Sequence, residues 1–206
     1  AERDYKRAIA LRPSAWAAYS YYGVFLNGRG RQKEAETVLR QALALAPDNA
    51  RLWSSLGVVL YREERLDDAE AAWKRSIAIQ PNAGATSNLA TRQYYTGRYA
   101  EAARGFEKAV ELSPLDYRVW FNLASARDWA PGERPRADAA YRKAIELGER
   151  ELALDPQNPM LLGALAGCLA RIGQKDRART LISEATRFDP TNPAVASVAA
   201  VVYEDL

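Results

Sequence analysis

Small and bulky apolar side chains recur along the whole chain with the spacing of one helix face. In residues 1–13 a small residue is followed four positions later by a bulky one, seven later by another small one and twelve later by a proline. The same spacing returns at 35–47, 69–81, 102–114 and 178–190. Positions four and seven apart share a helix face, and proline cannot continue a helix because it lacks an amide hydrogen. Each segment is therefore predicted to be a helix that ends near its proline.

A second helix is predicted ahead of each of these segments. Its apolar face is marked at 52–61 by Trp53, Leu56, Gly57 and Leu60, and at 19–26 by Tyr19, Tyr22, Gly23 and Leu26. Small residues recur in both helices, which lets the paired helices approach, and a bulky replacement would overpack the contact by roughly 1–3 kcal/mol. They are Gly23, Gly57, Ala90, Ala124 and Ala166 in the first helix and Ala35, Ala69, Ala102, Ala137 and Ala178 in the second.

The period divides the chain into repeated helix pairs. Ala1, Ala35, Ala69 and Ala102 are 34, 34 and 33 residues apart, and 34 residues hold two helices and two turns. We expect full units at 16–49, 50–82, 83–116, 117–158 and 159–192, with a lone second helix at 1–13 and a lone first helix at 193–206. The fourth unit carries an extra heptad within 140–156, so its second helix is expected to be longer and to project from the array. The unpaired segment 1–13 is interpreted as a cut through a repeat, with residues 1–12 packed on the helix at 16–27.

The amino-acid composition mainly excludes classes of function, namely metal sites and catalytic triads. The 206 residues contain no His and one Cys, and 29 Lys and Arg balance 26 Asp and Glu. Because His is the commonest general base and zinc ligand, its absence removes most metal sites and hydrolase triads. Cys168 lies among apolar helix residues and is expected to be a buried, inert thiol. We therefore expect no catalytic residue, no metal and no cofactor, and the lone thiol favours a reducing, cytoplasmic setting.

The 34-residue pattern resembles the tetratricopeptide repeat, a helix–turn–helix unit with eight signature positions. In the unit at 50–82 these positions hold Trp53, Leu56, Gly57, Leu60, Ala69, Trp73, Ser76 and Pro81. The resemblance implies an all-α fold, a right-handed superhelical solenoid of antiparallel helix hairpins with about five repeats and partial repeats at both ends. It also implies a non-catalytic scaffold for protein–protein interaction. More loosely, residues 87–156 resemble arrays attached to bacterial eukaryotic-like serine/threonine kinases, nucleotide cyclases and winged-helix regulators.

The family's concave groove is lined by the first helix of each unit, and its positions here are polar and aromatic. Tyr and Trp offer large contact area at low entropic cost, while Asn and Arg can hydrogen-bond a peptide backbone or carboxylate. Groove positions such as Phe121 and Ser125 belong to this surface. Its candidate peptide-binding residues are Tyr61, Asn88, Tyr94, Tyr95, Arg118, Asn122 and Trp129. The tyrosines are equally well explained as packing against adjacent helices.

Two parts of the groove depart from the family's best-known pattern. Ser54 and Val58 stand where the chaperone-binding branch has Lys and Asn, so that branch's carboxylate clamp is incomplete and a chaperone tail is not the expected ligand. In the fifth unit the groove positions are small and apolar, namely Met160, Gly163, Ala164 and Gly167. Such a face would admit a packed helix, either from a partner or from the chain's own continuation.

Three functions remain open at this point. The first is an interaction module whose groove binds a protein or peptide partner. The second is a regulatory or dimerising appendage of a signalling enzyme or transcription factor, with self-association through the array ends. The third is an RNA-binding helical solenoid, which the net charge of only +3 and the lack of one repeated polar code disfavour. We expect no nucleic-acid partner and no membrane partner, because no apolar run reaches about 18 residues.

Overall fold

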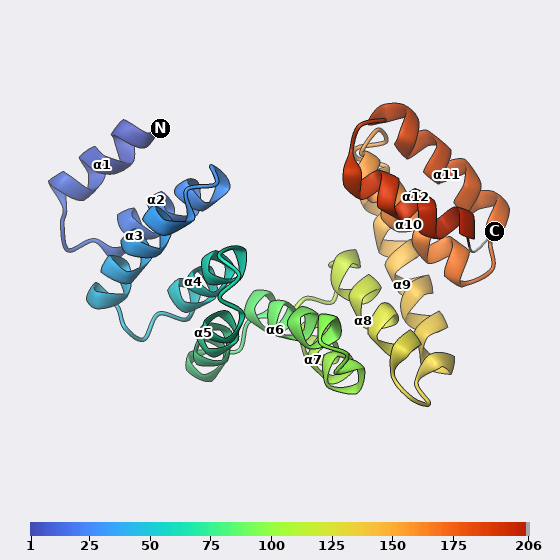
Figure 1. Ribbon diagram of the computed structural model, residues 1–206, viewed down its shortest axis with the longest axis horizontal. Helices are drawn as coiled ribbons and strands as arrows, with labels where there is room; N and C mark the ends of the chain where they lie inside the picture. Colours follow the sequence, from blue (N-terminus) through green and yellow to red (C-terminus); the bar gives the residue numbers. More distant parts are fainter. Residues whose placement is uncertain (205–206) are drawn as a thin grey trace. The chain divides into compact units, whose positions relative to one another are not determined.

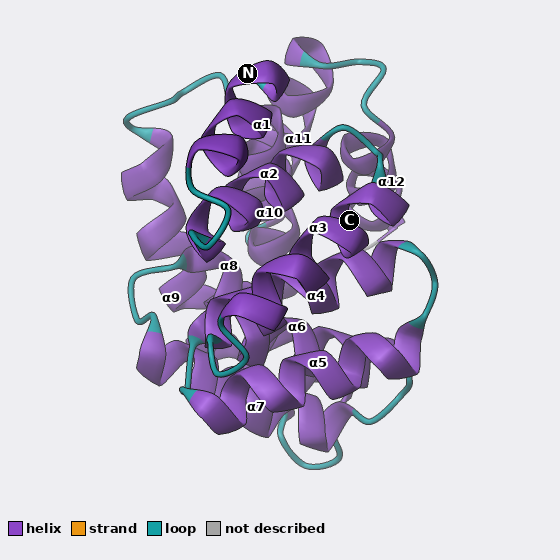
Figure 2. Ribbon diagram, turned by 90° about the vertical axis from the view of Figure 1, so that its left-hand side faces the viewer, coloured by secondary structure: helices purple, strands orange, loops and turns teal. Residues whose placement is uncertain are grey.

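The computed structural model describes residues 1–204, which form twelve α-helices and no strand (Figures 1 and 2). The all-α prediction is confirmed over this range. None of these helices is both long and apolar enough to cross a membrane. The helices are α1 (Glu2–Leu11), α2 (Trp16–Gly28), α3 (Gln32–Leu45), α4 (Ala50–Arg62), α5 (Leu66–Ile79), α6 (Ala83–Tyr95), α7 (Tyr99–Leu112), α8 (Tyr117–Trp129), α9 (Arg134–Leu152), α10 (Pro159–Arg171), α11 (Lys175–Phe188) and α12 (Pro193–Glu204).

The chain folds as two compact units, residues 1–92 and residues 93 onward, and the division falls inside α6. In the first unit α2 pairs with α3 and α4 with α5; in the second α8 pairs with α9 and α10 with α11. Only short turns join the two helices of a pair, so each pair is an antiparallel hairpin. Neighbouring hairpins pack on one another within each unit, as α3 does on α4 and α9 on α10.

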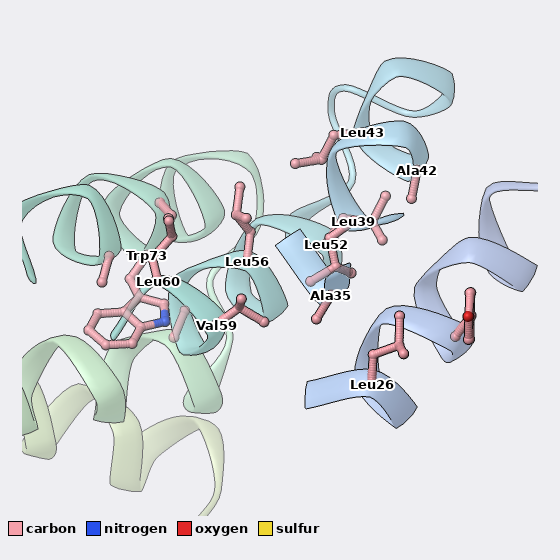
Figure 3. Packing of buried hydrophobic residues seen from close by; sticks show 14 residues of the cluster. Leu26, Ala35, Leu39, Ala42, Leu43, Leu52, Leu56, Val59, Leu60 and Trp73 are labelled. Carbon is pink, nitrogen blue, oxygen red and sulfur yellow. The ribbon is translucent and has the colours of Figure 1, made fainter. Parts of the chain in front are cut away.

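A layer of apolar side chains from α2 to α5 holds the N-terminal unit together. Leu39, Leu56 and Trp73 are almost fully buried in it, and Figure 3 shows them among their neighbours. A Cβ atom built at Gly23 would lie 2.7 Å from Leu39 Cγ, and one built at Gly57 would lie 2.4 Å from Trp73 Nε1. Glycine is needed at both contacts because the facing side chain occupies the space of a methyl group. The expected role of the small residues is confirmed here.

α1 packs on α2 through Tyr5, whose ring centroid lies 5.9 Å from that of Tyr22 and 5.4 Å from that of Phe25. The Glu2 carboxylate accepts hydrogen bonds from Tyr22 Oη at 2.9 Å and from Arg31 Nη1 at 2.7 Å. Since Arg31 immediately precedes α3, these bonds tie α1 to both helices of the following hairpin.

The first helices of the later hairpins begin at an Asn or Asp that follows a proline. At α4, for example, the side chain of Asn49 accepts a hydrogen bond from the Leu52 amide at 3.2 Å. Such caps satisfy backbone amides that have no partner within the helix. The equivalent caps are Asn82, Asp116, Asn158 and Asn192.

An aromatic side chain six residues after the proline ties the connecting loop to the helix. Tyr19 Oη donates to the Pro13 carbonyl at 3.0 Å, and the Nε1 atoms of Trp53 and Trp120 donate to the carbonyls of Pro47 and Pro114 at 2.8 and 2.9 Å. The sequence pattern predicts these aromatic residues to be packing residues only. The structure shows that they also donate a hydrogen bond to a loop carbonyl.

Left-handed backbone conformations mark the turns inside the hairpins. Gly30, Gly97, Gly132 and Gly173 have φ values of 74–77°, and Glu64 has φ 60° at the equivalent turn between α4 and α5. Glycine adopts this conformation without a steric penalty, whereas a side chain does not. Glu64 therefore holds a strained position that the other turns give to glycine.

The C-terminal unit differs from the first in the length of α9. This helix has 19 residues, against 14 in α7 and α11, and the difference lies in the segment where the extra heptad was expected. The added turn packs on α10 only at its start, where a Cβ atom built at Gly148 would lie 2.7 Å from Leu165 Cδ2. Beyond it, residues 149–151 are exposed.

α12 covers the small, apolar face of α10. Val198 Cγ1 lies 3.9 Å from the Cβ positions built on both Gly163 and Gly167, which is ordinary van der Waals contact. Val195 and Val202 are buried beside it. The sequence left two occupants open for this face, a partner's helix or the chain's own continuation. The structure shows the chain's own last helix there.

Candidate functional site

A hollow of about 220 Å³ opens in the C-terminal unit, and we call it the aromatic pocket. First helices of successive hairpins supply most of its wall, because these helices face the same side of a repeat array. Its lining residues are Tyr94 from α6, Phe121, Ser125, Asp128 and Trp129 from α8, Tyr141 from α9, Gly167 and Arg171 from α10, and Ser197, Val198, Val201 and Val202 from α12.

Stacked aromatic rings build one side of the aromatic pocket. Trp129, the last residue of α8, is 57% exposed and stacks on Tyr99, with ring centroids 5.8 Å apart and planes at 27°. Tyr99 in turn meets the edge of Tyr94 at 5.3 Å, and Tyr94 meets Tyr95 at 5.6 Å. Aromatic pairs prefer such offset or edge-on arrangements, so each ring restrains the next. The exposed indole is therefore presented in a defined orientation.

Asp128 and Tyr141 form the polar part of the aromatic pocket. Tyr141 Oη donates a hydrogen bond to Asp128 Oδ2 at 2.9 Å, and Arg134 Nη1 lies 3.7 Å from Asp128 Oδ1. The Asp128 side chain is only 6% exposed. Burial raises the pKa of Tyr141, with the Asp128 charge as a further cause, so the phenol remains a hydrogen-bond donor at neutral pH. The guanidinium of Arg171 adds a positive charge to the same wall.

An ion-pair network centred on the buried Arg127 holds the loop that follows Trp129. Arg127 is 9% exposed and its Nη2 donates to Glu107 Oε1 at 2.6 Å. Arg136 also donates to Glu107, at 3.1 Å, and to Glu133 Oε2, at 2.7 Å. The network joins α7, α8 and α9 around the turn at 130–133, which fixes the end of α8 where Trp129 stands.

Trp129 also lines a second, more open hollow of about 330 Å³, which we call the charged hollow. It lies at the turn between α6 and α7 and is lined by Gly97, Arg98, Tyr99, Ala100, Glu101, Arg104, Trp129 and Pro131. Arg98 Nη1 lies 3.7 Å from Glu101 Oε2, a loose ion pair. The indole of Trp129 is thus a wall shared by an aromatic hollow and a charged one.

The structure brings together only some of the residues proposed from the sequence. Tyr94 and Trp129 line the aromatic pocket, and Tyr95 contacts Tyr94 beside it. Arg118 and Asn122 lie on the same helix as Trp129 but outside the pocket. Arg118 pairs with Asp116 at 2.9 Å, with its guanidinium over the ring of Tyr117.

Two more of the proposed residues belong to the N-terminal unit. Tyr61 packs against Trp73, with ring centroids 5.8 Å apart, and remains partly exposed. This contact fits the alternative in which the tyrosine packs on an adjacent helix. Asn88 is half-buried on α6.

Asp128, Tyr141 and Arg171 of the aromatic pocket were not predicted from the sequence, although a signal existed for two of them. Asp128 stands in the same register as Tyr61 and Tyr94, four residues after the small residue of its helix, and Arg171 stands in the register of Trp129, five residues after it. Extending the groove register to every unit would have included both. Tyr141 occupies a signature packing position and is buried, so its sequence context indicates a core residue.

Comparison with known proteins agrees with the helical repeats. Sequence profiles described as tetratricopeptide repeat match residues 1–50, 28–84 and 87–128, and a second profile with the same description matches residues 136–202. A search of curated proteins finds no match.

Solved structures with this fold are similar over nearly the whole chain. PilF of Pseudomonas aeruginosa is 26% identical, with a TM-score of 0.67 over 94% of this chain and 86% of that one. YrrB, a TPR protein with an unusual peptide-binding site, is 16% identical, with a TM-score of 0.62 over 97% of this chain and 100% of that one. A chain of the APC/C hetero-tetramer Cut9–Hcn1 is 17% identical, with a TM-score of 0.75 over 98% of this chain but 39% of its own length. The chain belongs to the tetratricopeptide repeat family, whose helical solenoids generally serve as scaffolds for protein–protein interaction.

Proposed function

We propose that this protein is a non-catalytic scaffold that binds a peptide segment or a partner helix, with the aromatic pocket as its main contact site. The observation that carries the proposal is the exposed indole of Trp129, held by Tyr99 at the edge of a hollow that Tyr94 also lines. Exposed Trp and Tyr in a shaped hollow are typical of binding hot spots. They offer large apolar contact and lose little conformational freedom on binding.

The size of the aromatic pocket favours a side chain over a small-molecule ligand. Sites for drug-sized ligands and cofactors usually enclose about 300–1,000 Å³. The hollow of about 220 Å³ suits one or two side chains of a longer ligand. A peptide ligand also has a precedent in this fold, since YrrB carries a peptide-binding site.

The remaining candidate residues extend the proposed contact. Arg118 and Asn122 stand earlier on α8, so a segment that leaves the pocket along this helix would meet their polar groups. Tyr95 would enlarge the aromatic surface next to Tyr94. In the N-terminal unit, Tyr61 and Asn88 are proposed as contacts from the same groove positions of their own repeats.

Peptide selection on the purified 206-residue chain tests the proposal. A display library of random linear peptides is selected on the immobilised protein, and enriched peptides are synthesised and titrated by fluorescence anisotropy. Trp129→Ala is expected to raise Kd by about thirtyfold, the loss expected for a hot-spot residue. Leu115→Ala is the matched control, because Leu115 is 75% exposed and lines neither hollow. If no peptide is enriched over a blank surface, or if Trp129→Ala leaves Kd unchanged, the proposed site is wrong.

A further inference from the structure

We infer that the bound segment is an extended peptide that carries a large apolar side chain and, two residues away, a carboxylate. The inference rests on the proposed function and specifies its ligand. It follows from the two hollows that share Trp129, since a chain that crosses the indole would place one side chain in each.

The aromatic pocket takes the apolar side chain. Phe121, Val198, Val201 and Val202 supply much of its lining. The carboxylate in its wall, Asp128, already accepts the Tyr141 hydroxyl and is 6% exposed. Since Asp128 and Arg171 both already have partners within the protein, a polar ligand group would give up water for little gain there, whereas an apolar group gains from burial.

The charged hollow takes the carboxylate. Its lining contains two arginines, Arg98 and Arg104, and one glutamate, Glu101. Arg98 already lies close to that glutamate. Arg104 is exposed and forms no ion pair with any residue in the range 1–204. The two hollows together hold three guanidinium groups and two carboxylates. Their net positive charge complements an acidic segment, and Arg104 is the group that would meet its carboxylate.

The spacing of two residues follows from the geometry of an extended chain. Alternate side chains of a strand point to the same face and are about 7 Å apart along the chain. Residues i and i+2 of the ligand would therefore stand on the same side of its backbone, on either side of the Trp129 indole. A helical ligand would instead repeat its contacts every three or four residues.

A charge-swap experiment tests this inference. Peptides selected on the wild-type protein are expected to pair a large apolar residue with Asp or Glu two positions away. Replacing that acidic residue by Lys should raise Kd by about fivefold, the effect expected of one exposed ion pair. Arg104→Glu should weaken the acidic peptide to a similar degree and should restore binding of the Lys peptide. A variant that merely disturbed the fold would not restore the second peptide.

Arg179→Glu is the matched control, because it makes the same change of net charge on α11, outside both hollows. It should leave the Kd of both peptides unchanged. If selected peptides bind the wild-type and Arg104→Glu proteins equally, or carry no acidic residue at the stated spacing, the inference is wrong while the proposed function stands. If no peptide is enriched at all, the proposed function fails first.

Discussion

Gly57→Ala is expected to destabilise the N-terminal unit, although alanine is the better helix former. Replacing Gly by Ala inside a helix normally contributes about 0.5–1 kcal/mol of stability. At Gly57, however, the new methyl group would lie 2.4 Å from Nε1, 2.5 Å from Cδ1 and 2.9 Å from Cε2 of Trp73. All three distances are below van der Waals contact, so either the indole or the helix must move.

The indole has little room to move. Trp73 is 2% exposed, and its ring contacts that of Tyr61 at a centroid distance of 5.8 Å. Overpacking a filled core costs about 1–3 kcal/mol, and this contact belongs near the upper end because the three atoms belong to a rigid ring. After the helix-propensity gain, the net loss is about 2 kcal/mol. For a chain of this size that corresponds to a fall in Tm of roughly 4–8 °C.

Thermal and urea unfolding followed by far-UV circular dichroism would measure the loss. Gly84→Ala is the control, because Gly84 is also helical but a Cβ there would meet nothing closer than 3.9 Å. It should leave stability unchanged or slightly raised. Trp73→Phe should rescue Gly57→Ala, since the smaller ring frees the space that the methyl group needs. If Gly57→Ala proves as stable as the wild type, the close approach of α4 and α5 is not limited by packing.

Three further outcomes follow from local features. Glu64→Gly should stabilise the protein by about 1 kcal/mol in urea unfolding, because Glu64 has φ 60° where the other turns have glycine; an equal gain from Glu64→Ala would contradict this reason. The pKa of Glu2 is lowered from 4.5 to about 2, chiefly by the hydrogen bond from Arg31, so the contribution of Glu2 to docking α1 is present above pH 4.5 and lost as the pH falls towards 2. After correction for the intrinsic pH dependence of amide exchange, the protection factors of the α1 amides should fall over that interval in the wild type but not in Glu2→Gln. Burial raises the pKa of Cys168 to about 12, so a thiol reagent at pH 8 should modify it only after urea unfolding; fast labelling of the native protein would show that α10 opens readily.

The helices and their pairing could be predicted because their causes lie close together in the chain. Ala35, Leu39 and Ala42 share a helix face through their spacing alone, and Pro47 ends the helix for a local steric reason. Tyr94 and Trp129 were predicted as groove residues because they occupy register positions that the repeat defines. Asp128 and Arg171 occupy the same register positions in their own helices, so both could also have been predicted as groove residues.

The sequence by itself determined the helical period, the hairpin repeats and the family, since each depends on spacing within a few tens of residues. Only the tertiary structure decided that Tyr141, a packing residue by pattern, donates its hydroxyl to Asp128. It also decided that Trp129 stands between an aromatic and a charged hollow, and that α12 covers Gly163 and Gly167. These features depend on how closely and at what angle separate helices pack, and side-chain volumes at many contacts set that geometry together.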